Sequence, residues 1–168
     1  MQFYIHQNTG TETLFTISDS LGQPIYRVKG DSLSIGSKFY LIDNNENEAA
    51  RIFSVGLSAL SKYTIFIDDK ERARVILNLT ATAPKQPIKI KGIKGIRWRF
   101  RGDLITRSYD IIDVDSTVIM THGRCWNAGG DCFAVDITNE SDVLLSLCIA
   151  VIVDSTVIAS PAAALPVS

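Results

Sequence analysis

The most restrictive feature of this chain is a run of eleven uncharged residues near its C-terminus, Val143–Val153, in which Ser146 carries the only hydroxyl group. A helix made of this run would be apolar around its whole circumference, so either protein or lipid has to enclose it. A membrane span needs about twenty apolar residues, whereas this run is shorter and is followed by Asp154. We therefore predict no transmembrane span but a C-terminal helix buried inside protein, with core residues Val143, Leu144, Leu145, Leu147, Ile149, Val151 and Ile152.

The residues that flank the run indicate where such a helix begins and ends. Asn139 or Ser141 can cap the free backbone amides of its first turn. Pro161 sets an outer limit for its far end. The run is also rich in β-branched residues, a composition that favours strands.

The chain before this run has the pattern of short antiparallel strands. Leu14–Ile17 and Ile25–Val28 alternate apolar with polar residues, and the break between them, Asp19–Gly22, has the composition of a hairpin turn. The same pattern recurs at Tyr63–Ile67 and Ala73–Leu77, on either side of Asp68 and Asp69. The sequence therefore predicts a mainly β fold in which one sheet meanders from hairpin to hairpin.

Three blocks recur in the same order at spacings of seventy to seventy-two residues. The pairs are Tyr26–Asp31 with Trp98–Asp103, Ile42-Asp43 with Ile112-Asp113, and Tyr63–Ile67 with Phe133–Ile137. We predict one domain over residues 1–168 with two similar halves, about 1–80 and 88–159, and a tail at 160–168. Two copies are too few for a solenoid, so the halves are expected to close into a barrel or a sandwich.

Charge and cysteine content limit the choice of compartment and partner. Seventeen basic and eighteen acidic residues give a net charge of −1, so no overall field attracts nucleic acid or a membrane. Residues 1–7 lack the basic stretch and apolar segment of a secretory signal. Three cysteines without a Cys-x-x-Cys pair argue against a disulfide framework. We expect a cytoplasmic protein, either free or peripheral at a membrane.

The order of these motifs resembles that of the LURP-one-related proteins. The resemblance covers residues 2–159 and rests on the turns Gly30-Asp31 and Gly102-Asp103, on Ile112-Asp113, and on Trp126 and Phe133–Ile137 before the apolar run. This family belongs to the tubby C-terminal-like superfamily, which also includes the phospholipid scramblases. The resemblance implies a closed barrel of about twelve antiparallel strands around a central hydrophobic C-terminal helix.

The resemblance implies less about function. Tubby proteins bind phosphoinositides and scramblases are associated with lipid movement, but the LURP-one-related branch has no generally assigned reaction. The chain lacks a scramblase's proline-rich extension and acidic calcium-binding segment, so the resemblance does not extend to scrambling. No tubby lipid-binding residue can be transferred to a position of this chain.

The segment Lys85–Arg101 has the densest charge of the sequence, with seven cations and no acid before Asp103. Cations alternate with apolar residues, so on strands they would form a row on the outer surface. Lys89, Lys91, Lys94, Arg97, Arg99 and Arg101 are our candidate residues for binding phospholipid headgroups, because Lys and Arg pair well with phosphate. The alternatives are a solvated exterior balanced by Asp103 and Asp110, and a weak nucleic-acid site.

No catalytic or metal-binding motif accompanies this basic segment. His122, Cys125 and Cys132 have metal-ligand chemistry, but zinc sites usually have four ligands and closely paired cysteines. We expect no metal, no cofactor and no identifiable catalytic residue. The sequence thus favours a non-enzymatic binding or scaffold module for anionic phospholipid or phosphoinositide headgroups, or for a protein partner. The alternative is an enzyme whose site is assembled from scattered residues.

Overall fold

The structure of the protein is a computed structural model that describes residues 1–168 except 9–11, 31–37, 56–59, 79–86, 126–131 and 160–168. Its strands are β1 (Gln2–Gln7), β2 (Thr13–Ser18), β3 (Pro24–Gly30), β4 (Lys38–Asp43), β5 (Glu48–Val55), β6 (Leu60–Ile67), β7 (Lys70–Asn78), β8 (Ile88–Gly92), β9 (Arg99–Asp103), β10 (Ser108–Ile112), β11 (Val118–Cys125) and β12 (Cys132–Ile137). A 3-10 turn, Glu140–Asp142, leads into helix α1, Val143–Ala159.

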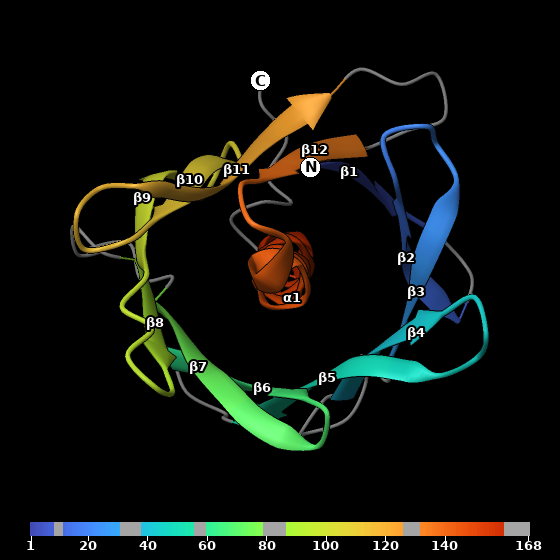
Figure 1. Ribbon diagram of the computed structural model, residues 1–168, viewed down its shortest axis with the longest axis horizontal. Coiled ribbons are helices and arrows are strands. Elements are labelled where there is room, and N and C mark those ends of the chain that lie inside the picture. The colour runs from blue at the N-terminus through green and yellow to red at the C-terminus, as the bar shows by residue number, and fades with distance from the viewer. Residues whose placement is uncertain (9–11, 31–37, 56–59, 79–86, 126–131, 160–168) are drawn as a thin grey trace.

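The twelve strands form one closed antiparallel barrel (Figure 1). Each strand pairs with its neighbours in sequence, and β1 pairs with β12, with Ile5 opposite Phe133, to close the sheet. Closure leaves no strand edge open to pairing with another chain. The predicted barrel of twelve antiparallel strands around a C-terminal helix is therefore confirmed, and the sandwich alternative is excluded.

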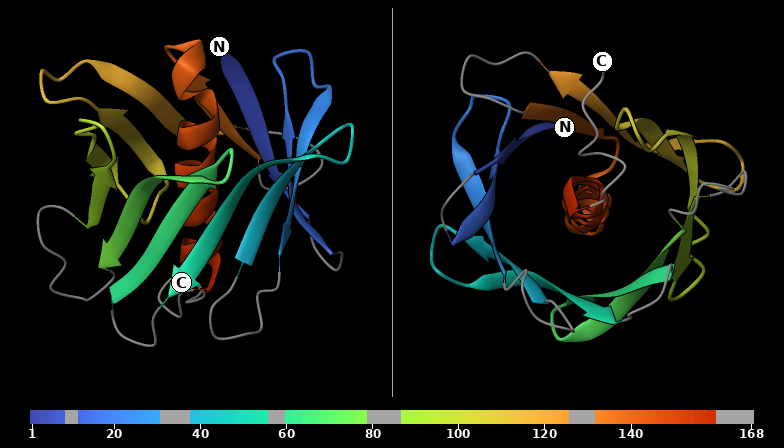
Figure 2. Two further views of the ribbon diagram at one scale, coloured as in Figure 1. Left: turned by 60° about the horizontal axis from the view of Figure 1, so that its bottom comes forward. Right: turned by 180° about the vertical axis from the view of Figure 1, so that it is seen from behind.

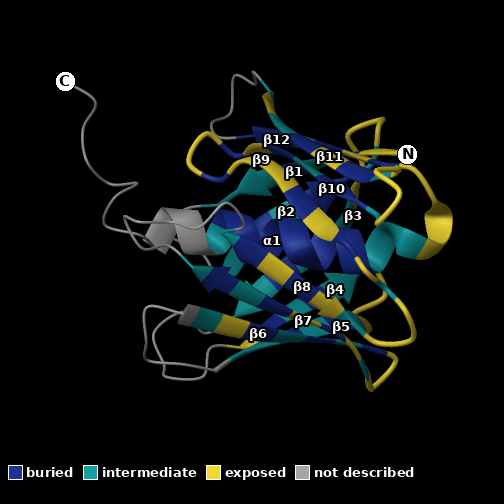
Figure 3. Cartoon of the chain, turned by 90° about the vertical axis from the view of Figure 1, so that its left-hand side faces the viewer, coloured by how far each residue is buried: buried dark blue, intermediate teal, exposed yellow. Residues whose placement is uncertain are grey.

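The alternation seen in the sequence separates the inner and outer surfaces of the barrel. In β7, Ala73, Val75 and Leu77 are buried, whereas Arg74 between them is exposed. Figure 3 shows the same change between buried and exposed residues along the other strands. Because successive side chains of a strand point to opposite faces, a strand with one polar residue in two can still contribute apolar side chains to the interior.

Helix α1 runs through the middle of the barrel, surrounded by strands (Figures 1 and 2). Leu147–Asp154 are completely buried. Two residues predicted for the core, Val143 and Leu144, are only half-buried, because they lie where the helix enters the barrel. Asn139 makes no capping bond through its side chain, which contacts Asp142 instead.

The helix is longer than the apolar run that predicted it. It continues through Asp154 to Ala159, just short of the limit set by Pro161. Within the described part of the chain, no helix is long and apolar enough to cross a bilayer.

Five hairpin turns lie at the end of the barrel where α1 begins and Met1 is found, an end that we call the N-terminal rim (Figure 2, left). Aspartate side chains bond backbone N–H groups in three of these turns, and in two of them the pattern is the same. Asp19 Oδ1 accepts bonds from the backbone N–H groups of Leu21 and Gln23. Asp43 Oδ1 does the same for Asn45 and Asn47. Such side-chain bonds explain why Asp-rich breaks in the sequence are tight turns.

The recurring sequence blocks occupy strands that are six positions apart in the barrel. Tyr26–Asp31 begins in β3 and Trp98–Asp103 ends in β9. Ile42 is the penultimate residue of β4 and Ile112 is the last residue of β10, and the third pair of blocks lies on β6 and β12. Two similar six-stranded halves would give this spacing, and the division into halves stays a prediction.

The enclosed helix leads to a test of the core. We expect Ile149→Asp to abolish cooperative unfolding in urea, because an unpaired charge buried in an apolar interior costs several kcal/mol and domains of this size have only about 5–15 kcal/mol to lose. Ile105→Asp is the control, because Ile105 is 80% exposed and should tolerate the same change. A soluble Ile149→Asp protein with a wild-type unfolding transition would contradict the enclosure of α1.

Candidate anion-binding face

The described cations of the basic segment all lie on the outer surface of the barrel. In β8, exposed Lys89 and Lys91 alternate with buried Ile88 and Ile90. The same alternation continues through β9, with buried Trp98 and Phe100 between exposed Arg97, Arg99 and Arg101. Lys94 is exposed in the turn between these strands, and Lys85 lies outside the described residues.

The strand register brings further cations beside this row. Lys62 of β6 lies opposite Ile76 of β7, Ile76 lies opposite Lys89, and Lys89 lies opposite Arg99. Arg74 of β7 lies opposite Lys91 in the next row. We call the resulting outer surface of β6–β9 the basic face; it carries Lys62, Arg74, Lys89, Lys91, Lys94, Arg97, Arg99 and Arg101.

Lys62 and Arg74 were not among the residues predicted from the sequence, although their pattern carried a signal. Each is the polar member of an alternating strand, next to the buried Tyr63 and to the buried Ala73 and Val75. To place them beside the basic segment one must know that β6 pairs with β7 and β7 with β8, and no local sequence pattern specifies these pairings.

Carboxylates neutralise only part of the basic face. Asp110 binds Arg101 at 2.8 Å, and Glu71 binds Arg74. Arg99 donates to the carbonyl oxygen of Val114 instead of to an acid. Within the described part of the chain, Lys62, Lys89, Lys91, Lys94, Arg97 and Arg99 have no ion-pair partner.

Of the two acids predicted to balance the basic segment, only one forms an ion pair with it. Asp110 does neutralise a cation, but Asp103 accepts a backbone bond from Ile105. Unpaired like charges on neighbouring strands repel one another and create a positive local potential. An anion with several oxygens is the kind of ligand that would relieve this repulsion.

A buried polar cluster joins the helix to the barrel wall. His122 of β11 contacts Asp154 of α1, with 3.2 Å between Nε2 and Oδ2, and its Nδ1 lies 2.6 Å from the backbone oxygen of Arg107. The imidazole is stacked between the rings of Tyr109 and Phe133, and the guanidinium group of Arg107 covers Phe133. The contact with His122 gives Oδ2 of Asp154 a partner inside the barrel, whereas Oδ1 has none among the described residues.

The cluster does not have the accessibility of an active site. The side chains of His122 and Asp154 are 0% exposed, so a substrate cannot reach them in this conformation. Burial, together with the charge of Asp154, raises the pKa of Tyr109 well above its usual value. The cluster therefore fixes the position of α1, a role that the sequence did not indicate for His122.

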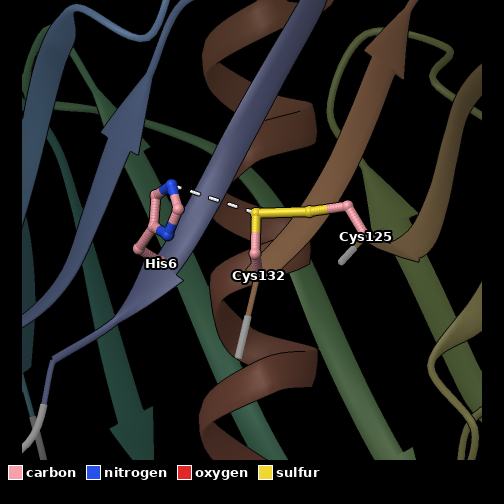
Figure 4. Close-up of a disulfide and its surroundings, with 3 residues drawn as sticks. All are labelled: His6, Cys125 and Cys132. Atoms are coloured by element: carbon pink, nitrogen blue, oxygen red, sulfur yellow. Dashed lines mark hydrogen bonds between the residues drawn. A yellow bond between two sulfur atoms is a disulfide. The ribbon is translucent and has the colours of Figure 1, made fainter. Parts of the chain in front are cut away.

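The prediction that the cysteines would not pair was wrong, because Cys125 and Cys132 form a disulfide (Figure 4). These residues lie opposite each other where β11 ends and β12 begins, at the connected end of the hairpin, with Cα atoms 5.4 Å apart. His6 of β1 lies beside the bond, with Nε2 3.9 Å from the sulfur of Cys132. The prediction relied on the number and spacing of the cysteines, which do not reveal that the pairing of β11 with β12 places these two opposite each other.

The same arrangement separates the three residues with metal-ligand chemistry. Cys125 and Cys132 are bonded to each other, whereas His122 points into the barrel against Asp154. Cys148 lies inside α1, where burial raises the pKa of its thiol.

A cavity of 390 Å³ opens at the N-terminal rim beside the start of α1. Its lining combines apolar side chains with the cation Arg72 and the acids Glu140 and Asp142. Burial, with a smaller effect of Asp43, raises the pKa of Tyr26 in the same lining. Because both signs of charge are present, the cavity does not favour one class of ligand.

Comparisons with known proteins agree with this architecture. A family model described as LURP-one-related matches residues 1–154. The uncharacterized protein YxjI of Bacillus subtilis (strain 168) is 29% identical over 140 residues, which are 83% of each chain. An X-ray structure of a protein from Arabidopsis thaliana has a TM-score of 0.66 and 15% identity, and the match covers 92% of this chain and 91% of that one.

The His122–Asp154 contact predicts a pattern of coupled stability losses. We expect His122→Phe and Asp154→Leu each to lower the free energy of unfolding by about 3 kcal/mol, because each leaves a buried polar partner unsatisfied. The double variant should lose less than the sum, since a phenyl ring keeps the aromatic stack and neither side chain of the pair is left without the other, although the carbonyl oxygen of Arg107 loses its partner whenever His122 is replaced. Urea denaturation measures all three variants, and strictly additive losses would contradict the coupling.

Proposed function

The chain belongs to the LURP-one-related family, and from that premise we propose that it is a non-enzymatic binding module whose basic face engages anionic phospholipid headgroups. One observation carries the proposal. In the strand register Lys62 of β6, Lys89 of β8 and Arg99 of β9 lie in one outer row, with Ile76 of β7 between Lys62 and Lys89. None of these three cations has an ion-pair partner among the described residues. The relatives do not identify a ligand, since the bacterial one is itself described as uncharacterized.

The chemistry of the basic face fits phosphate groups presented on a surface. Arginine offers a planar fork of N–H donors and lysine a compact charge, and both pair well with phosphate oxygens. Each cation near an anionic membrane adds about 1 kcal/mol to the attraction. Because the cations lie on the exterior of adjacent strands, several of them can meet one membrane surface at the same time.

The alternative of an enzyme with a scattered site has less support. The buried pair of His122 and Asp154, which has the chemistry of a general base and its orienting carboxylate, has no exposed surface. A phosphate-rich nucleic acid would attract the same cations, so it has to be one outcome of the test.

The disulfide changes where in the cell the protein is expected. The cytoplasmic assignment depended in part on unpaired cysteines, and that part of the argument no longer holds because Cys125 and Cys132 are bonded. Disulfides are rare in reducing compartments. We retain from the prediction a peripheral position at an anionic membrane surface, which the basic face would provide.

Replacement of Lys89, Lys91, Arg97 and Arg99 together by Gln tests the proposal. At about 1 kcal/mol per cation, the change should weaken binding to phosphatidylcholine vesicles that contain phosphatidylserine by about a thousandfold. Co-sedimentation with the vesicles measures binding, and added salt should weaken the wild type because exposed charges are screened within about 10 Å at 0.1 M.

The matched control changes Arg27, Lys29, Lys38 and Arg124 to Gln, which removes four charges from β3, β4 and β11, outside the basic face. It should retain most of the binding. A wild type that ignores anionic vesicles at low salt would refute the proposal. Tight binding to a DNA duplex without vesicle binding would assign the basic face to nucleic acid instead.

A further inference from the structure

Ile93 differs from the other exposed apolar side chains in its surroundings. It is 40% exposed in the turn between β8 and β9. Lys91, Lys94 and Arg97 are exposed around it, and none of them has an ion-pair partner in the described residues. An apolar side chain among free cations is the composition of surfaces that enter the headgroup region of a bilayer.

Other exposed apolar residues of the described chain lie beside acids or at the opposite rim. Val114 stands between Asp113 and Asp115, and Leu21 follows Asp19 by two residues. Ile105 is more exposed than Ile93, at 80%, but it lies in the turn between β9 and β10 at the far end of the barrel. The feature that distinguishes Ile93 is therefore its charge environment and not its exposure.

The conformation of the turn holds Ile93 outward. A Cβ atom at Gly92 would lie 2.1 Å from Cβ of Ile96, so glycine lets Ile96 fold back against the strand and line the cavity. Lys94 and Gly95 then reverse the chain with φ angles of 60° and 85°. The backbone N–H of Ile93 donates to the carbonyl oxygen of Arg72 at 3.0 Å, which ties the turn to β7.

The turn also continues the basic face to the N-terminal rim. Lys91 is the last cation of β8 and Arg99 the first of β9, so Lys94 and Arg97 prolong the same outer surface. Elsewhere the rim carries exposed carboxylates without an ion-pair partner among the described residues, such as Asp68 and Asp115, whereas Glu46 and Asp69 are paired with Arg27 and Arg51. An anionic membrane would repel that part of the rim, so the barrel has to approach with the β8–β9 turn and the adjoining basic face.

We propose that the β8–β9 turn is the element that enters the membrane, with the side chain of Ile93 inserted at the boundary of headgroups and acyl chains and with Lys94 and Arg97 against lipid phosphates. The inference rests on the proposed function and adds an apolar contact to its electrostatic attraction. It also defines how the barrel is oriented on the bilayer.

The first test is substitution of Ile93 by Ser. Loss of the apolar contact should weaken binding to phosphatidylcholine–phosphatidylserine vesicles about fivefold, since only part of the side chain is free to insert. Ile105→Ser is the matched control and should bind like the wild type, although it removes a more exposed side chain. An equal loss in both variants would mean general hydrophobic adsorption and would overturn the proposal.

The second test locates the turn directly. Ile93→Cys can be labelled selectively with an environment-sensitive dye, because Cys125 and Cys132 are bonded and Cys148 is buried. On vesicles the dye at position 93 should shift to the blue and be quenched by nitroxide-labelled lipid, whereas a dye at Ile105→Cys should not change.

The outcomes separate this inference from the proposed function. If the wild type binds the vesicles in a salt-dependent manner but the dye at position 93 stays in water and Ile93→Ser binds normally, only membrane insertion is wrong. If the wild type does not bind anionic vesicles at low salt, both the insertion and the lipid-binding function are wrong.

Discussion

The structure depends on a helix that cannot face water on any side. A barrel of about eight strands can be filled by its own side chains, whereas a wider barrel leaves space along its axis. In this protein α1 occupies that space, with Leu147–Asp154 completely buried. Helix and barrel thus require each other, because the sheet would enclose a void without the helix and the helix would expose its apolar surface without the sheet.

A polar contact in this interior explains how the far part of the helix is held. Asp154 would be costly to bury alone, but it meets His122, which is fixed by the carbonyl oxygen of Arg107 and by the rings of Tyr109 and Phe133. Apolar contacts can be satisfied at several rotations and depths of the helix. A directional contact between one residue of α1 and one residue of β11 is satisfied at a single position, so this pair supplies specificity where the apolar run cannot.

Local patterns predicted the parts of this fold that depend on periodicity. The uniform apolarity of Val143–Val153 was sufficient for the buried helix, and alternation was sufficient to place Lys89 and Lys91 on the outer surface. Contacts set by register could not be predicted in the same way. Asp154 and His122 are thirty-two residues apart, and Cys125 faces Cys132 only because β11 and β12 pair in one particular register. Lys62 and Arg74 likewise belong to the basic face only because of the strand register, so the sequence did not predict them there.

The filled interior also determines where this protein can act on other molecules. With α1 along the axis and the His122–Asp154 pair out of reach of solvent, the surfaces left for recognition are the barrel exterior and its rims. In a sheet, each outward-facing residue of a strand lies beside outward-facing residues of the adjacent strands. Alternation of polar and apolar residues along single strands therefore produces a patterned outer surface. Gly92 extends this array around the end of β8, because the absence of a Cβ atom lets Ile96 pack inward and leaves Ile93 at the surface. The same rule of alternation thus forms the apolar core on one side of the sheet and the basic face on the other.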